Sequence, residues 1–147
     1  MTITQPPPGY PTVSTYMVAI EIDPVIDFYT RVLGARVGEK LIDNDGHTRH
    51  TELRIGDSMI MIGRSPGEGL PPVAQTLYIY VDDVDAVQQA AIEAGATEII
   101  APADMFYGDR QGGVTDPFGN TLWLATRIEN LAPGELQRRA QEFWENN

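Results

Sequence analysis

Residues 23–35 have the sequence DPVIDFYTRVLGA, and residues 83–96 have the sequence DVDAVQQAAIEAGA. Both stretches carry apolar residues at helical spacing, begin with an aspartate and stop at a Gly-Ala pair. In the first stretch Asp23 suits the N-cap and Pro24 suits the first helical position. The chain therefore contains the same helical pattern twice, which indicates an internal repeat.

Strand patterns surround both helices in the same order. They cover residues 13–20, 35–40, 50–55 and 59–62 in the first half, and residues 76–81, 97–101, a segment through 114, and 121–126 in the second. The last two strands of the second half flank the turn 116–120, DPFGN. These patterns predict an α+β fold of two βαβββ modules that form a cup-shaped, mixed or antiparallel sheet.

The predicted domain organisation follows from the segments between these patterns. Module one spans residues 13–64 and module two spans 75–127; a linker rich in proline and glycine, 65–74, joins them. Residues 133–145 carry apolar residues at helical spacing and predict a C-terminal amphipathic helix. Residues 1–12 contain four prolines and predict a flexible arm. At 147 residues the chain suits one domain, so residues 13–147 are expected to form it.

Composition narrows the function classes. The formal net charge is −11, which opposes binding to nucleic acid or to an anionic membrane. There is no cysteine, so disulfides, thiolate metal sites and cysteine nucleophiles are excluded. No apolar stretch approaches the roughly 20 residues that cross a bilayer, and the start lacks the pattern of a signal peptide. A cytoplasmic location is expected.

Three segments together resemble a known superfamily. They are residues 26–35, IDFYTRVLGA, the run 106–114, FYGDRQGGV, and the turn 116–120. In their order and spacing they are similar to the vicinal oxygen chelate superfamily, which includes glyoxalases, bleomycin-resistance proteins and dioxygenases, and within it to a bacterial glyoxalase-like subgroup. The resemblance implies two modules closing a cup-shaped cavity, and often a dimer. Homodimerisation is also expected from open sheet edges and the extra helix.

The resemblance further implies four positions for metal ligands, in the first and last strand of each module. In this sequence they fall on Ser14, Thr76, Met61 (or Ile60 with a shift of one) and Trp123. A divalent cation in such a site prefers imidazole and carboxylate groups. We therefore expect no metal centre and no other cofactor.

Side-chain alternation along the strands predicts which residues line the cavity. One set is apolar and is expected under the helices: Leu53, Ile55, Ile60, Ile62, Leu77, Ile79, Val81, Leu122 and Leu124. The opposite set mixes aromatic, methionine and polar residues: Tyr16, Val18, His50, Glu52, Arg54, Met59, Met61, Tyr78, Tyr80 and Trp123. This second set is typical of a site for a planar, partly apolar small molecule, although it could also fill a closed core.

Two polar features of this predicted cavity leave alternatives open. His50 and Glu52 share a strand face and could form a structural pair, contact a ligand as an acid–base pair, or bind a metal. Arg110 could meet an anionic ligand, or it could form a salt bridge within the sheet. The candidate ligand-binding residues are Tyr16, His50, Glu52, Met61, Tyr78, Tyr80, Arg110 and Trp123.

The sequence thus favours a protein that binds or sequesters a small molecule without the usual metal, and an aromatic compound is one candidate. Whether it is an enzyme stays open. The main alternative is an isomerase, lyase or dioxygenase that uses a metal or the pair of His50 and Glu52. A third reading is an interaction module whose cup is filled by its own side chains.

Overall fold

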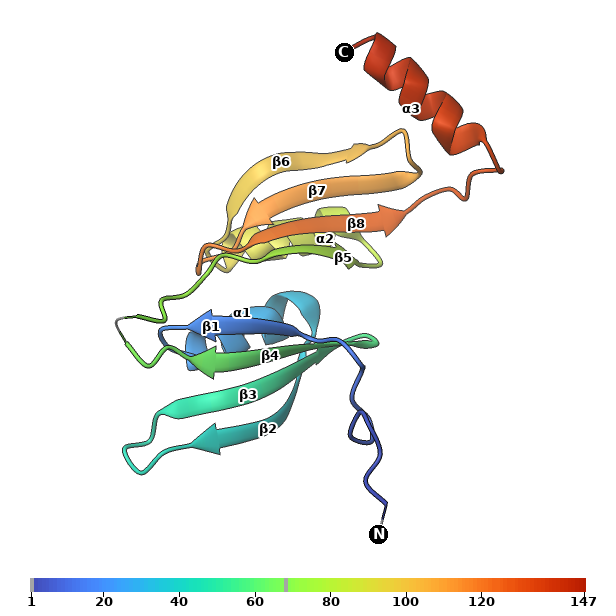
Figure 1. Ribbon diagram of the computed structural model, residues 1–147. Helices are drawn as coiled ribbons and strands as arrows, with labels where there is room; N and C mark the ends of the chain where they lie inside the picture. The colour runs from blue at the N-terminus through green and yellow to red at the C-terminus, as the bar shows by residue number, and fades with distance from the viewer. Residues whose placement is uncertain (1, 68) are drawn as a thin grey trace. The chain divides into compact units, whose positions relative to one another are not determined.

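A computed structural model describes residues 2–67 and 69–147 of the chain, and it divides into two compact units, residues 1–74 and 75–147. Each unit contains one helix and a four-stranded sheet, and the second unit ends with a third helix (Figure 1). The two units have the same order of elements, so the predicted α+β fold of two βαβββ modules is confirmed. Within the described residues, no helix has the length and apolar character needed to cross a membrane.

Module one is a mixed sheet. Its elements are β1 (Thr15–Ala19), α1 (Asp23–Leu33), β2 (Arg36–Ile42), β3 (Thr48–Ile55) and β4 (Ser58–Arg64). The strand order is β1-β4-β3-β2, with β1 parallel to β4 and the other pairs antiparallel. The parallel pair needs a long crossover, and α1 lies in it.

Module two repeats this topology. Its elements are β5 (Thr76–Tyr80), α2 (Val84–Glu93), β6 (Thr97–Asp104), β7 (Asp109–Thr115) and β8 (Thr121–Arg127). The order is β5-β8-β7-β6, again with one parallel pair, β5 and β8. The boundary between the units falls at the end of the predicted linker 65–74. That the two modules form one domain stays a prediction.

The ends of α1 show how local sequence sets the helix. Gly34 closes it with a left-handed backbone (φ 64°), which is the conformation that glycine adopts without strain. The prediction for its start was wrong by one residue, because Ile22 is the N-cap and Asp23 is already helical. The Asp23 carboxylate instead accepts a hydrogen bond from Thr48 Oγ1 (2.8 Å) and pairs with Lys40. It therefore ties the helix to β3 and β2.

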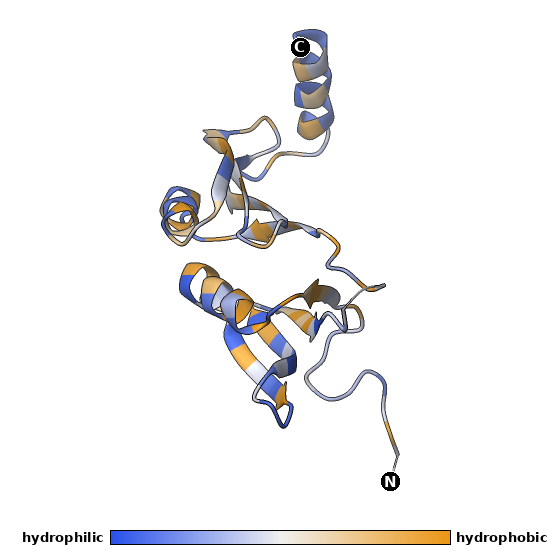
Figure 2. Cartoon of the chain, turned by 90° about the vertical axis from the view of Figure 1, so that its left-hand side faces the viewer, coloured by the Kyte–Doolittle hydropathy of each residue, from blue (hydrophilic) through white to orange (hydrophobic). Residues whose placement is uncertain are grey.

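Each module has a helix side and an open face. The term helix side denotes the sheet face packed against α1 or α2, and open face denotes the opposite one; Figure 2 shows each helix on one side of its own sheet. On the helix side five residues of the predicted apolar set are buried, as expected: Leu53, Ile60, Ile62, Leu122 and Leu124. The others of that set, Ile55, Leu77, Ile79 and Val81, are half-buried. The alternation of side chains along the strands therefore predicted which residues of each sheet face the core.

The turn before β8 is held by side chains. Asp116 Oδ1 accepts from the backbone N–H groups of Phe118 (2.9 Å) and Asn120 (2.8 Å), and Asn120 Nδ2 donates to Asp116 Oδ2 (2.9 Å). Asn120 Oδ1 in turn accepts from the backbone of Gln75 (2.9 Å). The DPFGN turn thereby joins β7, β8 and the segment before β5.

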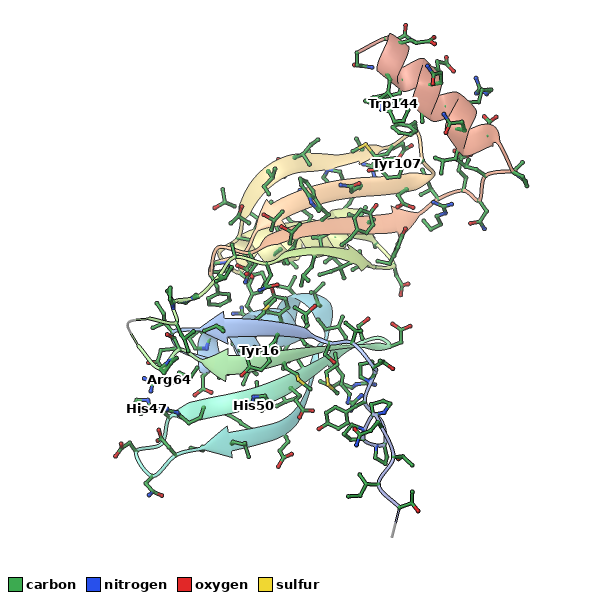
Figure 3. The ribbon with its side chains drawn as sticks, in the orientation of Figure 1. Tyr16, His47, His50, Arg64, Tyr107 and Trp144 are labelled. Atoms are coloured by element: carbon green, nitrogen blue, oxygen red, sulfur yellow. The ribbon has the colours of Figure 1, made fainter. Side chains whose placement is uncertain are left out.

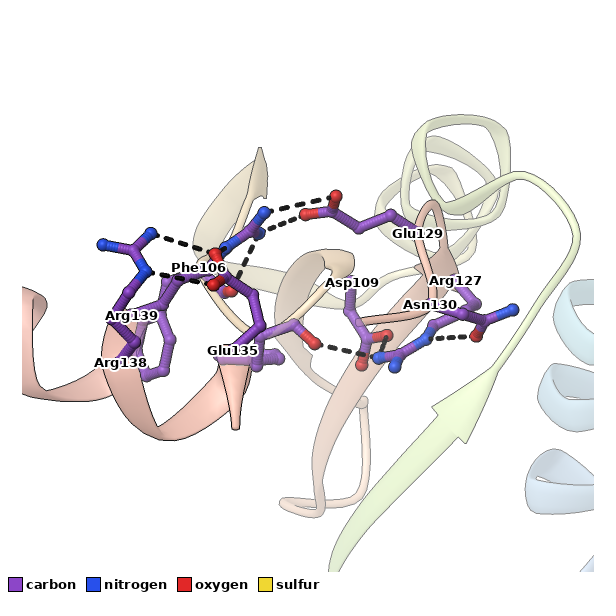
Figure 4. A network of polar contacts seen from close by, with 9 residues as sticks. Phe106, Asp109, Arg127, Glu129, Asn130, Glu135, Arg138 and Arg139 are labelled. Atoms are coloured by element: carbon purple, nitrogen blue, oxygen red, sulfur yellow. Dashed lines mark hydrogen bonds and ion pairs between the residues drawn. The ribbon is translucent and has the colours of Figure 1, made fainter. Parts of the chain in front are cut away.

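The C-terminal helix α3 (Glu135–Glu145) is amphipathic, as expected. Arg139 fixes its first turns: it donates to the backbone oxygen of Phe106 (3.3 Å), to Glu135 (2.9 Å) and to Glu129 (Figure 4). Phe143 also lies against Phe106, with ring centroids 4.9 Å apart. The other large apolar side chains of α3, Leu136 and Trp144, are exposed.

Candidate functional site

The open face of module one presents Tyr16 above the sheet. Its ring lies across Gly63 of β4, where a β-carbon would collide with the Tyr16 hydroxyl. The ring also lies near His50, with centroids 6.2 Å apart, and Figure 3 shows both residues on this sheet. Glu52 and Met61 are register partners in β3 and β4, so they share this face. Four predicted site residues of module one, Tyr16, His50, Glu52 and Met61, are thus brought together.

The N-terminal arm contributes a residue that was not predicted. The Tyr10 hydroxyl donates to Glu52 Oε1 at 2.7 Å, and Arg54 Nη1 donates to the backbone oxygen of Gly9 at 2.8 Å. The Arg54 guanidinium also lies 5.7 Å from the centroid of the Tyr10 ring. The hydrogen bond to the Glu52 carboxylate, with desolvation and its negative charge, raises the pKa of Tyr10 above its ordinary value. Tyr10 therefore stays a neutral donor.

His50 and Glu52 do not form a direct hydrogen bond. Their nearest atoms, Nε2 and Oε1, are 4.0 Å apart, which is beyond hydrogen-bond distance. Glu52 is only 7% exposed, and its Oε1 accepts from Tyr10 instead. His50 and Glu52 are therefore close to each other, but the Glu52 carboxylate is hydrogen-bonded to the arm.

The open face of module two carries a cluster of polar and aromatic groups centred on Asp109. Asp109 is 2% exposed, yet its Oδ2 accepts from the hydroxyls of Tyr78 (2.6 Å) and Tyr80 (3.0 Å). Its Oδ1 accepts from Arg127 Nη1 (3.0 Å), a contact drawn in Figure 4. We call Tyr78, Tyr80, Asp109 and Arg127 the Asp109 cluster. Its tyrosines are 45% and 61% exposed, so their rings face outward while their hydroxyls point to the buried carboxylate.

Electrostatics fix the charge states in the Asp109 cluster. Burial alone raises the pKa of Asp109, but the hydrogen bonds from Tyr78, Arg127 and Tyr80 outweigh it and hold that pKa below its ordinary value. Desolvation, together with its hydrogen bond to Asp109, raises the pKa of Tyr78 strongly. The separate hydrogen bond from Tyr80 to Asp109 raises the pKa of Tyr80. Asp109 is therefore ionised and both phenols are neutral at physiological pH.

Two further residues extend this cluster. Gln111 Oε1 accepts hydrogen bonds from the hydroxyls of Tyr78 (3.3 Å) and Tyr107. Tyr107 lies in the turn between β6 and β7. Trp123 lies over Gly113 on the same face, because a β-carbon there would come within 2.5 Å of its ring. Trp123 and Tyr78 are register partners in the parallel pair, so their side chains leave the same face of adjacent strands. The predicted residues Tyr78, Tyr80 and Trp123 therefore do share one face.

Arg110 is not part of this face. It lies on the helix side, where its Nε and Nη2 donate to both oxygens of Asp85 in α2 (2.7 and 3.0 Å) and its Nη1 donates to Asp104 (3.0 Å). These bonds raise the pKa of Arg110. Of the two alternatives that the sequence left open, the structure places Arg110 in the intramolecular salt bridge.

The positions that hold metal in related proteins do not fit a cation here. In module one they carry Ser14 and Met61, and in module two Thr76 and Trp123. Neither pair offers an imidazole or a carboxylate. Across residues 2–67 and 69–147, no three His, Asp or Glu side chains come together in a way that could hold a metal ion.

Sequence reasoning missed Tyr10, Tyr107, Asp109 and Gln111. Asp109 and Gln111 alternate with Arg110 in β7, so strand parity would have placed them on the open face once the start of that strand was known. Tyr107 lies in a turn and Tyr10 in a proline-rich arm, where no periodicity indicates direction.

Similarity to known sequences assigns the chain to a family. The sequence model of the Glyoxalase/Bleomycin resistance protein/Dioxygenase superfamily matches residues 14–124. An uncharacterised protein of Mycobacterium bovis is 31% identical over 137 residues, which cover 86% of this chain and 90% of the relative. The chain belongs to the glyoxalase/bleomycin resistance protein/dioxygenase superfamily.

Solved structures show the same fold at low identity. TioX from Micromonospora sp. ML1 aligns with a TM-score of 0.66 at 22% identity, covering 79% of this chain and 99% of that protein. A glyoxalase/bleomycin resistance protein/dioxygenase family enzyme from Burkholderia phytofirmans aligns with a TM-score of 0.62 at 24% identity, covering 78% and 97%. At this identity the likeness establishes the fold alone.

Proposed function

We propose that this protein binds or sequesters a small, at least partly aromatic molecule without a metal, in the manner of bleomycin-resistance proteins. One observation carries the proposal: Tyr78, Tyr80 and Trp123 share one open sheet face, and the two tyrosine hydroxyls donate to a buried, ionised Asp109. Aromatic rings supply rigid apolar surface, and the polar groups beneath them orient a ligand. The residues at the family's metal positions support metal independence.

The enzyme alternative has weaker support. Acid–base chemistry by His50 and Glu52 requires the imidazole to exchange a proton with the carboxylate or with a substrate. The 4.0 Å separation and the hydrogen bond from Tyr10 to Glu52 hold the pair in a different arrangement. We therefore rank an isomerase, lyase or dioxygenase activity second.

Trp123 provides the test. The chain has two tryptophans, so Trp144→Phe leaves Trp123 as the one tryptophan reporter. We expect its emission to change saturably with one- and two-ring aromatic compounds, equally with and without a chelator, and Tyr78→Ala to weaken the response. The control is Trp123→Phe, in which Trp144 should not respond. A response that requires zinc or nickel, or none at all, would contradict the proposal.

Two further parts of the proposal concern assembly and location. We propose a homodimer, because α3 exposes Leu136, Phe143 and Trp144 and because each sheet has edge strands. Light scattering at micromolar concentration should give twice the 16.2 kDa chain mass, and a monomer mass would contradict this part. A cytoplasmic location is proposed from the sequence pattern, and cell fractionation tests it.

A further inference from the structure

The N-terminal arm binds back onto the open face of module one. A turn brings Tyr10 there: its backbone N–H donates to Pro7 (3.0 Å), and Gly9 has a left-handed backbone (φ 82°). Arg54 then holds the arm through the backbone oxygen of Gly9 (2.8 Å). The arm is therefore anchored to the sheet through the Tyr10 hydroxyl and the Gly9 carbonyl.

Tyr10 satisfies a carboxylate that needs a donor. Glu52 is 7% exposed, and an ionised carboxylate only accepts hydrogen bonds. Among the residues that the structure describes, Tyr10 donates the one hydrogen bond that the Glu52 carboxylate receives, at 2.7 Å. This exposed fraction holds with the arm in place; without the arm the carboxylate would face the open side of the sheet, with His50 4.0 Å away. A ligand that covers the carboxylate in place of the arm must supply an O–H or N–H donor, because a buried polar group left unbonded is costly.

Space for the rest of a ligand lies beside Tyr10. A hollow of about 560 Å³ lies there. The arm lines it with Pro6, Pro7 and Tyr10, and module one lines it with Ser14, Tyr16 and Met61. The arm forms one wall of this hollow, so a ligand that displaces the arm meets only the wall that module one provides. Tyr16 and Met61 offer the aromatic and polarizable surface that suits an aromatic body.

We propose that the open face of module one is a site for a phenolic ligand, and that Tyr10 occupies the position of the phenol in the free chain. This inference rests on the proposed small-molecule function. The ligand's hydroxyl donates to Glu52, and its ring takes the place beside the Arg54 guanidinium. The rest of the molecule lies against Tyr16 and Met61, which line the hollow from module one. The arm is then an internal competitor, which the ligand must displace.

The charges of the site argue for a neutral phenol over an acid. Glu52 would repel a carboxylate ligand, and the negative charges of Glu52 and Glu39 both raise the pKa of Tyr10. They act in the same sense on any phenol in that position, and so favour its protonated, donating form.

The test compares p-cresol with 4-methylanisole, which has the same ring but no donor. Calorimetry should show a preference for p-cresol of about tenfold or more in Tyr10→Phe, which removes the competing hydroxyl. In the unmodified chain p-cresol should bind about tenfold more weakly than in Tyr10→Phe, because the arm must leave first. In ¹H–¹⁵N spectra of the unmodified chain, saturating p-cresol should shift the amides of Gly9 and Tyr10 to random-coil positions.

A matched pair of carboxylate variants identifies the acceptor. Glu52→Leu, which removes the acceptor, should reduce the preference for p-cresol in the Tyr10→Phe background to about one. Asp57→Asn, which removes one negative charge from the turn between β3 and β4, should leave the preference unchanged. The inference is overturned if Tyr10→Phe shows no preference, if the preference survives Glu52→Leu, or if the arm amides stay in place at saturation. If Trp123 still responds to aromatic compounds in those cases, the proposed function stands without this inference; if neither site binds, both fail.

Discussion

Replacing Asp109 with alanine should strongly destabilise module two. The change removes the acceptor of three hydrogen bonds, from Tyr78 (2.6 Å), Tyr80 (3.0 Å) and Arg127 (3.0 Å). A hydrogen bond to a charged group contributes about 1.5–3 kcal/mol. The three donor side chains are 45%, 61% and 41% exposed and can bond to water in part, so the loss is smaller than the sum of three such bonds. We therefore expect the free energy of unfolding at pH 7 to fall by about 2–4 kcal/mol.

Urea denaturation followed by circular dichroism measures this loss, and Asp104→Ala is the matched control. The Asp104 side chain also pairs with an arginine at 3.0 Å, but it is 67% exposed, so its removal should cost less than about 1 kcal/mol. Equal losses in the two variants would refute the central role given to the buried carboxylate.

The same carboxylate predicts a pH dependence. The pKa of Asp109 is below its ordinary value of 3.8 in the folded chain, so its contribution to stability is present above that value. The contribution is lost as the pH falls through the lower, folded pKa. The stability advantage of the unmodified chain over Asp109→Asn should therefore shrink below about pH 4. An advantage that stays constant down to pH 2.5 in urea titrations would contradict this.

Three other substitutions have defined outcomes. Gly112→Ala should lower the melting temperature through a loss of about 1–3 kcal/mol, because the new methyl group meets the buried Gln88 amide; an unchanged melting temperature would count against this packing. Asn120→Ala should cost about 2 kcal/mol in urea denaturation, since it removes bonds to Asp116 and to the chain before β5; a loss under half of that would be evidence against it. Arg110→Ala should cost about 1 kcal/mol yet leave the fluorescence response to aromatic compounds unchanged; a weaker response would place Arg110 in the site after all.

The repeat made the fold predictable from sequence. Periodicity located both helices, and the Gly-Ala stops at residues 34–35 and 95–96 marked their ends because the backbone there turns left-handed. Alternation along the strands separated the buried Leu53 and Leu122 from the outward-facing Tyr78. Short-range rules were therefore sufficient wherever a segment was regular.

The remaining site residues depended on features that a pattern does not carry. The face of Arg110 could be assigned only once the register of β7 against β8 was known, in which Arg110 pairs with Thr126. Pairing between β6 and β7 is also irregular, with shifts around Ile100 that alternation cannot foresee. Tyr10 reaches Glu52 across 42 residues of sequence, a contact made by tertiary folding alone.

Glycine beneath an aromatic ring has a consequence for how ligand preference can change. Tyr16 rests on Gly63 and Trp123 rests on Gly113, so each ring lies close to the backbone because a side chain is missing below it. A single methyl group at either glycine would lift the ring and alter the shape of the surface that a ligand meets. Under the proposed function, substitutions at these two glycines would change ligand preference by moving the rings above them.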